Sequence, residues 1–140
     1  MAYTTAADCL AKLSEHGAAA YLDDDGDGVL NSAEKQRITD AIAYADKVID
    51  GKLTAAGLKV KTAGVVIKEA SIWLALAQAC VRKGNEAAWI GAQAKAQLDV
   101  IDMIARGKLR VDDEVTTVSK APRTRVSDPI VKPGEGVDWS

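Results

Sequence analysis

Residues 23–34 form the segment of the sequence whose residue types and spacing predict a specific chemistry. They match the twelve-residue EF-hand calcium loop at every position of its pattern. The oxygen ligands that this pattern places around a cation are Asp23, Asp25, Asp27, the backbone carbonyl of Val29, Asn31 and Glu34. Carboxylate, amide and carbonyl oxygens are the ligands that Ca²⁺ prefers, and Gly28 permits the sharp turn between them. The segment is therefore a candidate calcium site.

We expect this calcium site to be structural and not a switch. Sensor EF-hands normally occur in pairs, whereas the sequence contains one such loop. Gly17 also interrupts the helix that would enter the loop. The alternative that stays open is a polar turn whose aspartates and glycines serve only solubility.

No other residues show the pattern of a catalytic or metal site. The G-x-S-x-G, P-loop and H-E-x-x-H motifs are absent. His16 is the single histidine and shares no ligand spacing with a cysteine or an acidic cluster, so we expect it to have a surface or capping role. Cys9 and Cys80 are expected to be small buried hydrophobic residues in a reducing compartment. We therefore expect that the protein is not an enzyme.

The composition is that of one globular domain, with 140 residues of which 48% are hydrophobic and 27% charged. Its 18 basic and 20 acidic residues give a net charge of -2, which disfavours autonomous binding to nucleic acid. The sequence shows no secretory signal and no apolar run that approaches the length of a membrane span. The 25 alanines and the absence of proline before Pro122 predict an all-α fold class.

Four helices are expected in this small domain. Their predicted ranges are 5–16, 31–50, 64–83 and 86–106, and a glycine follows each range directly. One further turn is expected at residues 18–22. Residues 51–64 contain three glycines and no helical period, so a long loop with a few lysines is expected there.

The third and fourth predicted helices carry more apolar surface than a small domain needs. The third is apolar nearly all round, so it is either the centre of the domain or covered by a neighbour. We expect another copy of the chain to help to cover it, because a small domain has difficulty in burying such a helix alone. The fourth has two apolar stripes, of which the first is Ile90, Ala94, Leu98, Ile101 and Ala105, and the second is Trp89, Ala92, Ala96, Val100 and Met103. The second stripe either contacts another subunit or widens the core face, and the sequence leaves both possibilities open.

The sequence divides into a helical domain, residues 1–111, and an extended C-terminal arm, residues 112–140. The arm has few large apolar residues and contains all three prolines, so we expect it to become ordered only in an assembly. Its two β-prone runs, 115–118 and 124–131, are expected to add to a sheet edge or to lie along an adjacent subunit. Trp139 is either an anchor that docks into a partner or an incidental exposed side chain.

Three stretches together resemble one protein family. They are M-A-Y-T-T-A-A-D-C-L at 1–10, the acidic loop at 22–31 with the helix I-T-D-A-I-A-Y-A-D-K-V-I-D-G-K-L at 38–53, and A-Q-L-D-V-I-D-M-I-A-R-G-K-L-R-V at 96–111. In this order they resemble the Mu-like head–tail connectors, or head-completion adaptors, of tailed bacteriophages. The resemblance covers residues 1–111. The sequence departs from the family pattern at residues 57–64, because family members usually have a proline in the segment that leads to the third helix.

The resemblance implies a structural adaptor in the virion, at the interface between head and tail, that is assembled in the host cytoplasm. Family members form a ring, typically of twelve copies, beneath the portal protein. The ring extends the DNA channel and presents a surface to a tail terminator or another tail component. DNA only passes through such a channel, and no membrane is involved. The alternative function is a monomeric calcium-binding module with an EF-hand-like loop.

Overall fold

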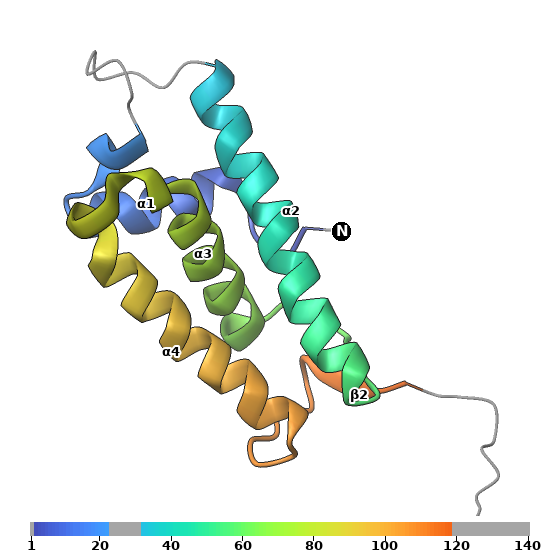
Figure 1. The fold of residues 1–140 in the computed structure, drawn as a ribbon. Coiled ribbons are helices and arrows are strands. Elements are labelled where there is room, and N and C mark those ends of the chain that lie inside the picture. Colours follow the sequence, from blue (N-terminus) through green and yellow to red (C-terminus); the bar gives the residue numbers. More distant parts are fainter. Residues whose placement is uncertain (1, 23–31, 119–140) are drawn as a thin grey trace, which may run out of the picture.

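The computed structural model describes residues 2–22 and 32–118, which form a bundle of α-helices with one small sheet (Figure 1). The α-helices in these residues are α1 (Ala6–Glu15), α2 (Ser32–Ala55), α3 (Val65–Ala79) and α4 (Ala88–Ala105). Two short 3₁₀ helices, η1 (Ala19–Leu22) and η2 (Val81–Ala87), follow α1 and α3, respectively. The strands are β1 (Leu58–Val60) and β2 (Val115–Thr117). The described residues confirm the predicted all-α class with four helices.

The ends of α1 and α4 agree closely with the sequence prediction. Thr5 caps α1, because its Oγ1 accepts a hydrogen bond of 3.1 Å from the backbone N–H of Asp8. Gly17 and Gly107 follow the two helices with φ angles of 67° and 75°, in the left-handed region that ends a helix. The predicted turn after Gly17 is η1. By contrast, α3 ends at Ala79 instead of Lys83.

The structure corrects the prediction for the segment after Asp50. The helix α2 continues through Gly51 to Ala55, and residues 58–60 form β1 instead of part of a long loop. A glycine inside a helix costs about 1 kcal/mol relative to alanine. Leu53 is fully buried, and burying a leucine contributes roughly 1.5–3 kcal/mol. The helix therefore passes Gly51, and the left-handed residue after its end is Gly57, with a φ of 75°.

The helix α3 lies at the centre of the bundle, between α2 and α4 (Figure 1). Its buried residues face every side of the helix, and they are Ile67, Ala70, Ser71, Ile72, Trp73, Leu74, Ala75, Leu76 and Ala79. The alternative that this helix is the centre of the domain is therefore confirmed, and the expectation that a second copy covers it is wrong, because α1, α2, α4 and η2 of the same chain cover it. One large apolar residue of α3, Val65 in the first turn, stays exposed, with an exposed fraction of 78%.

The two apolar stripes of α4 have different surroundings. In the first stripe Ile90, Ala94 and Ile101 are buried against the bundle. In the second stripe Ala92 and Ala96 are exposed, and Met103 is 40% exposed. The middle of the second stripe therefore faces away from the core of its own chain, and α4 presents a row of small and apolar side chains on the outside.

The strands β1 and β2 pair in antiparallel fashion, with Val60 opposite Val115 and Leu58 opposite Thr117. Residues 112–118, which the sequence assigned to the arm, therefore pack on the helical body, and the run 115–118 adds to a sheet edge within its own chain. For these residues the expectation that the arm becomes ordered only in an assembly is wrong. The run 124–131 and Trp139 lie outside the described residues. The division into two domains stays a prediction, and residue 119 is the earliest at which a separate arm can begin.

Candidate functional site

Glu114 connects the start of β2 to the N-terminus of α3. Its carboxylate accepts backbone hydrogen bonds from Gly64 at 3.0 Å, Val66 at 3.2 Å and Ile67 at 2.9 Å, and the residue is 4% exposed. The N–H groups in the first turn of a helix have no partner within the helix and lie at the positive end of its dipole, so a buried carboxylate is stabilised there. This contact positions β2 against the bundle.

Gly64 leaves the space that this carboxylate occupies. A Cβ atom at position 64 would lie 2.8 Å from Cδ of Glu114, which is closer than real Cβ contacts come. The two residues are 50 positions apart in the sequence. The contact could not be predicted from the sequence, because an acidic residue near a β-prone run carries no local sign of the helix that it caps.

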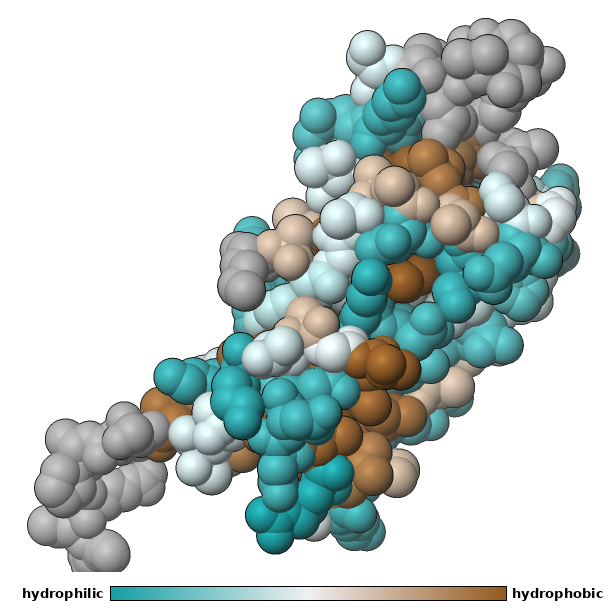
Figure 2. Space-filling view, turned by 180° about the vertical axis from the view of Figure 1, so that it is seen from behind, coloured by the Kyte–Doolittle hydropathy of each residue, from teal (hydrophilic) through white to brown (hydrophobic). Residues whose placement is uncertain are grey.

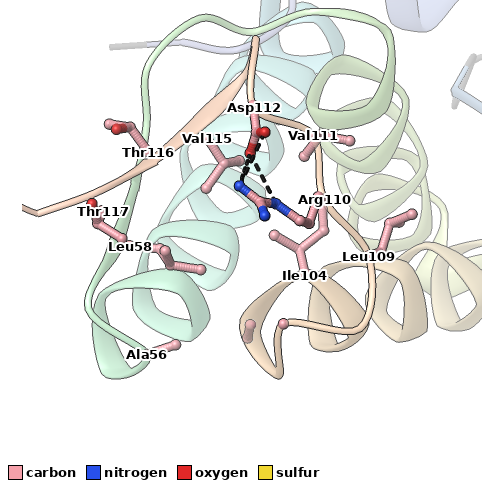
Figure 3. Close-up of a pocket in the computed structure, with 12 residues that line it drawn as sticks. Ala56, Leu58, Ile104, Leu109, Arg110, Val111, Asp112, Val115, Thr116 and Thr117 are labelled. Carbon is pink, nitrogen blue, oxygen red and sulfur yellow. Dashed lines mark hydrogen bonds and ion pairs between the residues drawn. The ribbon is translucent and has the colours of Figure 1, made fainter.

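A groove of about 520 Å³ opens between β2 and the end of α4 (Figure 3). The apolar side chains in its lining are Ala56, Leu58, Ile104, Ala105, Leu109, Val111 and Val115. Figure 2 shows hydrophobic side chains gathered at this end of the molecule, where Figure 1 places β2 and the last turns of α2 and α4. A groove of mixed apolar and polar lining beside the edge of a strand can bind an extended peptide segment. It is therefore the candidate docking site of the domain.

The charged groups of the groove form one exposed ion pair. Nη2 of Arg110 is 3.2 Å from Oδ2 of Asp112, and both side chains are highly exposed (Figure 3). An exposed ion pair of this kind contributes at most about 1 kcal/mol. The pair therefore opposes the entry of another segment only weakly.

A second hollow, also of about 520 Å³, lies between residues 2–6 and α2. Asp46 lines it and is 6% exposed. Its carboxylate accepts hydrogen bonds from the hydroxyl of Ser71 at 2.7 Å and from the backbone N–H of Tyr3 at 3.0 Å. The hydroxyl of Tyr3 in turn donates to Asp50. These contacts hold the N-terminal segment on α2.

Burial raises the pKa of Asp46 above its ordinary value, although the two hydrogen bonds lower it in part. The folded state therefore favours the protonated carboxyl. Its contribution to stability is present below the ordinary aspartate pKa of about 3.9 and is lost as the pH rises through the raised folded value. We expect the stability of the wild type relative to the Asp46→Asn variant to fall as the pH rises from below the ordinary aspartate value through the raised pKa of Asp46. Chemical denaturation of both proteins across this range measures the difference, and a difference that does not change with pH would contradict the prediction.

His16 lies in an aromatic cluster at the end of α1. Its ring centroid is 5.5 Å from that of Trp73 and 5.3 Å from that of Trp89. Nε1 of Trp89 donates a 3.3 Å hydrogen bond to the hydroxyl of Tyr21, which donates to the carbonyl of Glu86 at 2.9 Å. His16 is exposed and is the C-cap residue of α1, which confirms the predicted surface or capping role. The cluster fixes η1 against the start of α4.

Cys9 and Cys80 are both fully buried free thiols, as predicted. Burial, with smaller contributions from nearby groups such as Asp8 and Asp46, raises the pKa of the Cys9 thiol to about 12. The thiolate is the reactive form of cysteine. Cys9 therefore stays protonated and unreactive at neutral pH.

The predicted calcium site lies only partly within the described residues. Five of its candidate ligands lie outside them, namely Asp23, Asp25, Asp27, Val29 and Asn31. Glu34 is described, and it lies in the first turn of α2 with an exposure of 1%. That position is compatible with a ligand that closes the loop from the exiting helix. Among residues 2–22 and 32–118 no group of three or more histidine, cysteine or acidic side chains could hold a metal.

Comparison with known proteins gives the family of the chain. The family model described as Bacteriophage Mu, Gp36 matches residues 3–127, so the chain belongs to this family of bacteriophage proteins. The family suggests a structural or morphogenetic protein of a Mu-like phage. No curated protein and no solved structure showed significant similarity to the chain. Within the described residues, no helix is long and apolar enough to cross a membrane.

Proposed function

We propose that this protein is a structural adaptor that forms a ring between the portal and the tail of a Mu-like phage. Membership of the Mu Gp36 family over residues 3–127 is the observation that carries the proposal. In this role the ring extends the DNA channel, completes the head and offers a surface to a tail terminator or another tail component. The protein has no catalytic function in this account, and twelve copies are the number that the connector resemblance implies.

The exterior of α4 supports an interface between copies. Its second stripe presents exposed Ala92 and Ala96 and the partly exposed Val100 and Met103 on one side of the helix. Small side chains let a neighbouring helix approach closely, and apolar burial contributes roughly 25 cal/mol per Å². We therefore place the contact between neighbouring subunits on this stripe of α4, and not on α3.

The charge of the chain supports passage of DNA without tight binding. A net charge of -2 from 18 basic and 20 acidic residues gives no general attraction for phosphates. A channel that DNA must traverse requires weak contacts with the DNA backbone. The near-neutral composition therefore suits the wall of a channel better than it suits a nucleic-acid-binding domain.

The proposal is tested by mixing the purified protein with its portal and measuring the mass of the product by native mass spectrometry. We expect a complex that contains one portal and a closed ring of this chain. A monomeric free protein is consistent with the proposal, because the portal serves as the template on which the ring assembles. A protein that stays monomeric in the presence of an intact portal would overturn the proposal and would favour the alternative function, a monomeric calcium-binding module.

We also propose that residues 23–34 bind Ca²⁺ as a structural site. The position of Glu34 at the start of α2 is the structural observation that favours it. We expect the dissociation constant to be roughly 10⁻⁵–10⁻³ M, as for weak EF-hand loops. Isothermal calorimetry should show that Glu34→Gln and Asp23→Ala each weaken binding, whereas Glu15→Gln on α1 does not. Absence of heat at millimolar Ca²⁺ in a wild-type protein of normal helicity would contradict the prediction.

A further inference from the structure

We propose that the groove beside β2 is the docking site for residues 124–127 of the same chain, which add to the free edge of β2 as a third antiparallel strand. This inference goes beyond the adaptor function and does not depend on the formation of a ring. It assigns an occupant to the groove and limits the length of the free C-terminal arm.

The edge of β2 that faces away from β1 has backbone groups ready for pairing. The N–H of Val118 donates to the carbonyl of Gly57 at 2.8 Å, and the carbonyl of Glu114 accepts from Lys61. Backbone groups alternate in direction along an antiparallel strand, so the carbonyl of Val115 and both groups of Thr117 face the opposite edge. In the part of the chain that the structure describes, β2 pairs with β1 alone.

The pattern of side chains selects a register for the added strand. A hairpin loop of four residues, 119–122, is a common length and places Val126 opposite Val115. Val115 is 7% exposed and lines the groove, so Val126 would cover apolar surface there. The same register places Arg125 opposite Thr116, on the face of the sheet that carries the exposed Lys59. Apolar side chains then face the bundle and charged ones face solvent.

Two observations favour the same chain over another molecule as the source of this strand. The described chain ends at Val118, directly beside the free edge, and a short linker gives an effective concentration in the millimolar range. The family model also continues past Val118 and ends at residue 127, the last residue of the added strand. Pro129 follows two residues later and cannot donate to a sheet, which suits the end of a strand.

The consequence for the adaptor is a shorter arm. Residues 128–140 are left to reach a partner, and 13 fully extended residues span at most about 45 Å. A covered edge of β2 also prevents nonspecific pairing between copies.

The test uses the full-length chain with Thr116→Cys and Arg125→Cys. In the proposed register these residues form a pair without mutual hydrogen bonds, with Cα atoms about 4.5 Å apart, which suits a disulfide. The matched control is Thr116→Cys with Arg123→Cys, which lies two residues away on the same face. The buried native cysteines stay in place in every variant. Variants that carry only Thr116→Cys or only Arg125→Cys therefore measure the background of disulfides that form with the native cysteines.

We expect an intrachain disulfide in a glutathione buffer, formed at least about tenfold more readily than in the control. Three results would overturn the proposal: crosslinking between chains, which would assign the groove to a second copy; equal crosslinking in the control; or no crosslinking above the single-cysteine background. Hydrogen exchange on the wild type checks the result independently of the variants. It should show the amides of Thr124 and Val126 protected in the isolated protein, and rapid exchange at both would also overturn the proposal.

Discussion

Replacing Glu114 with alanine is expected to lower the free energy of unfolding by roughly 2–4 kcal/mol. The change removes the carboxylate that accepts three hydrogen bonds at the start of α3. The N–H groups of Gly64, Val66 and Ile67 then lose this acceptor. Urea denaturation followed by circular dichroism measures the loss. The control is Asp113→Ala, an exposed neighbour whose replacement should change stability by less than about 0.5 kcal/mol.

The same contact predicts that Gly64→Ala is destabilising by about 1–3 kcal/mol, because the new Cβ displaces the carboxylate of Glu114. A variant that combines Glu114→Ala with Gly64→Ala should then lose less stability than the sum of the two single losses, since both changes act on one contact. Gly51→Ala on α2 is the matched control, because nothing lies within 4 Å of its added Cβ and alanine favours the helix. Additive losses at positions 64 and 114 would contradict the assignment of Glu114 as the cap.

Replacing Ala96 with arginine is expected to abolish assembly of the ring on the portal while the monomer keeps its helicity. Ala96 is exposed in the free chain, so the arginine is solvated there and folding is unaffected. At a close contact between subunits the same charge would be buried without a partner, which costs several kcal/mol. A cost of this size lowers the affinity of each contact by roughly 10²–10³-fold. Sedimentation of mixtures with the portal measures the effect.

The matched control for this variant is Ala7→Arg, which places the same side chain on an exposed position of α1. It should assemble like the wild type. If the variant at position 96 assembles normally as well, the interface between subunits lies elsewhere on the molecule, and the outward stripe of α4 has another role.

The helices could be located from the sequence because their signals are local. The left-handed glycines at positions 17 and 107 act within one or two turns of the chain, and the structure has both directly after the helices, as expected. The end of α2 could not be predicted in this way. There the local cost of Gly51 is outweighed by the burial of Leu53, which depends on the neighbouring elements of the bundle.

The sites were less predictable than the helices, because they depend on contacts between distant residues. The cap formed by Glu114 joins residues 50 positions apart, and the groove exists only because β1 and β2 pair. The apolar character of α3 was read correctly, but its cover comes from four elements of the same chain and not from a second copy. The calcium loop was the strongest local motif, and five of its six candidate ligands lie outside the described residues.

The adaptor function is tested most directly by imaging phage particles with electron microscopy and locating this chain in the density. The account predicts a closed ring of copies between the portal and the tail, with α4 of each copy in contact with its neighbour. The number of copies follows from the symmetry of the ring, and twelve is the expected value. A particle in which this chain occupies the capsid shell or the tail tube, or in which the portal joins the tail without it, would contradict the account.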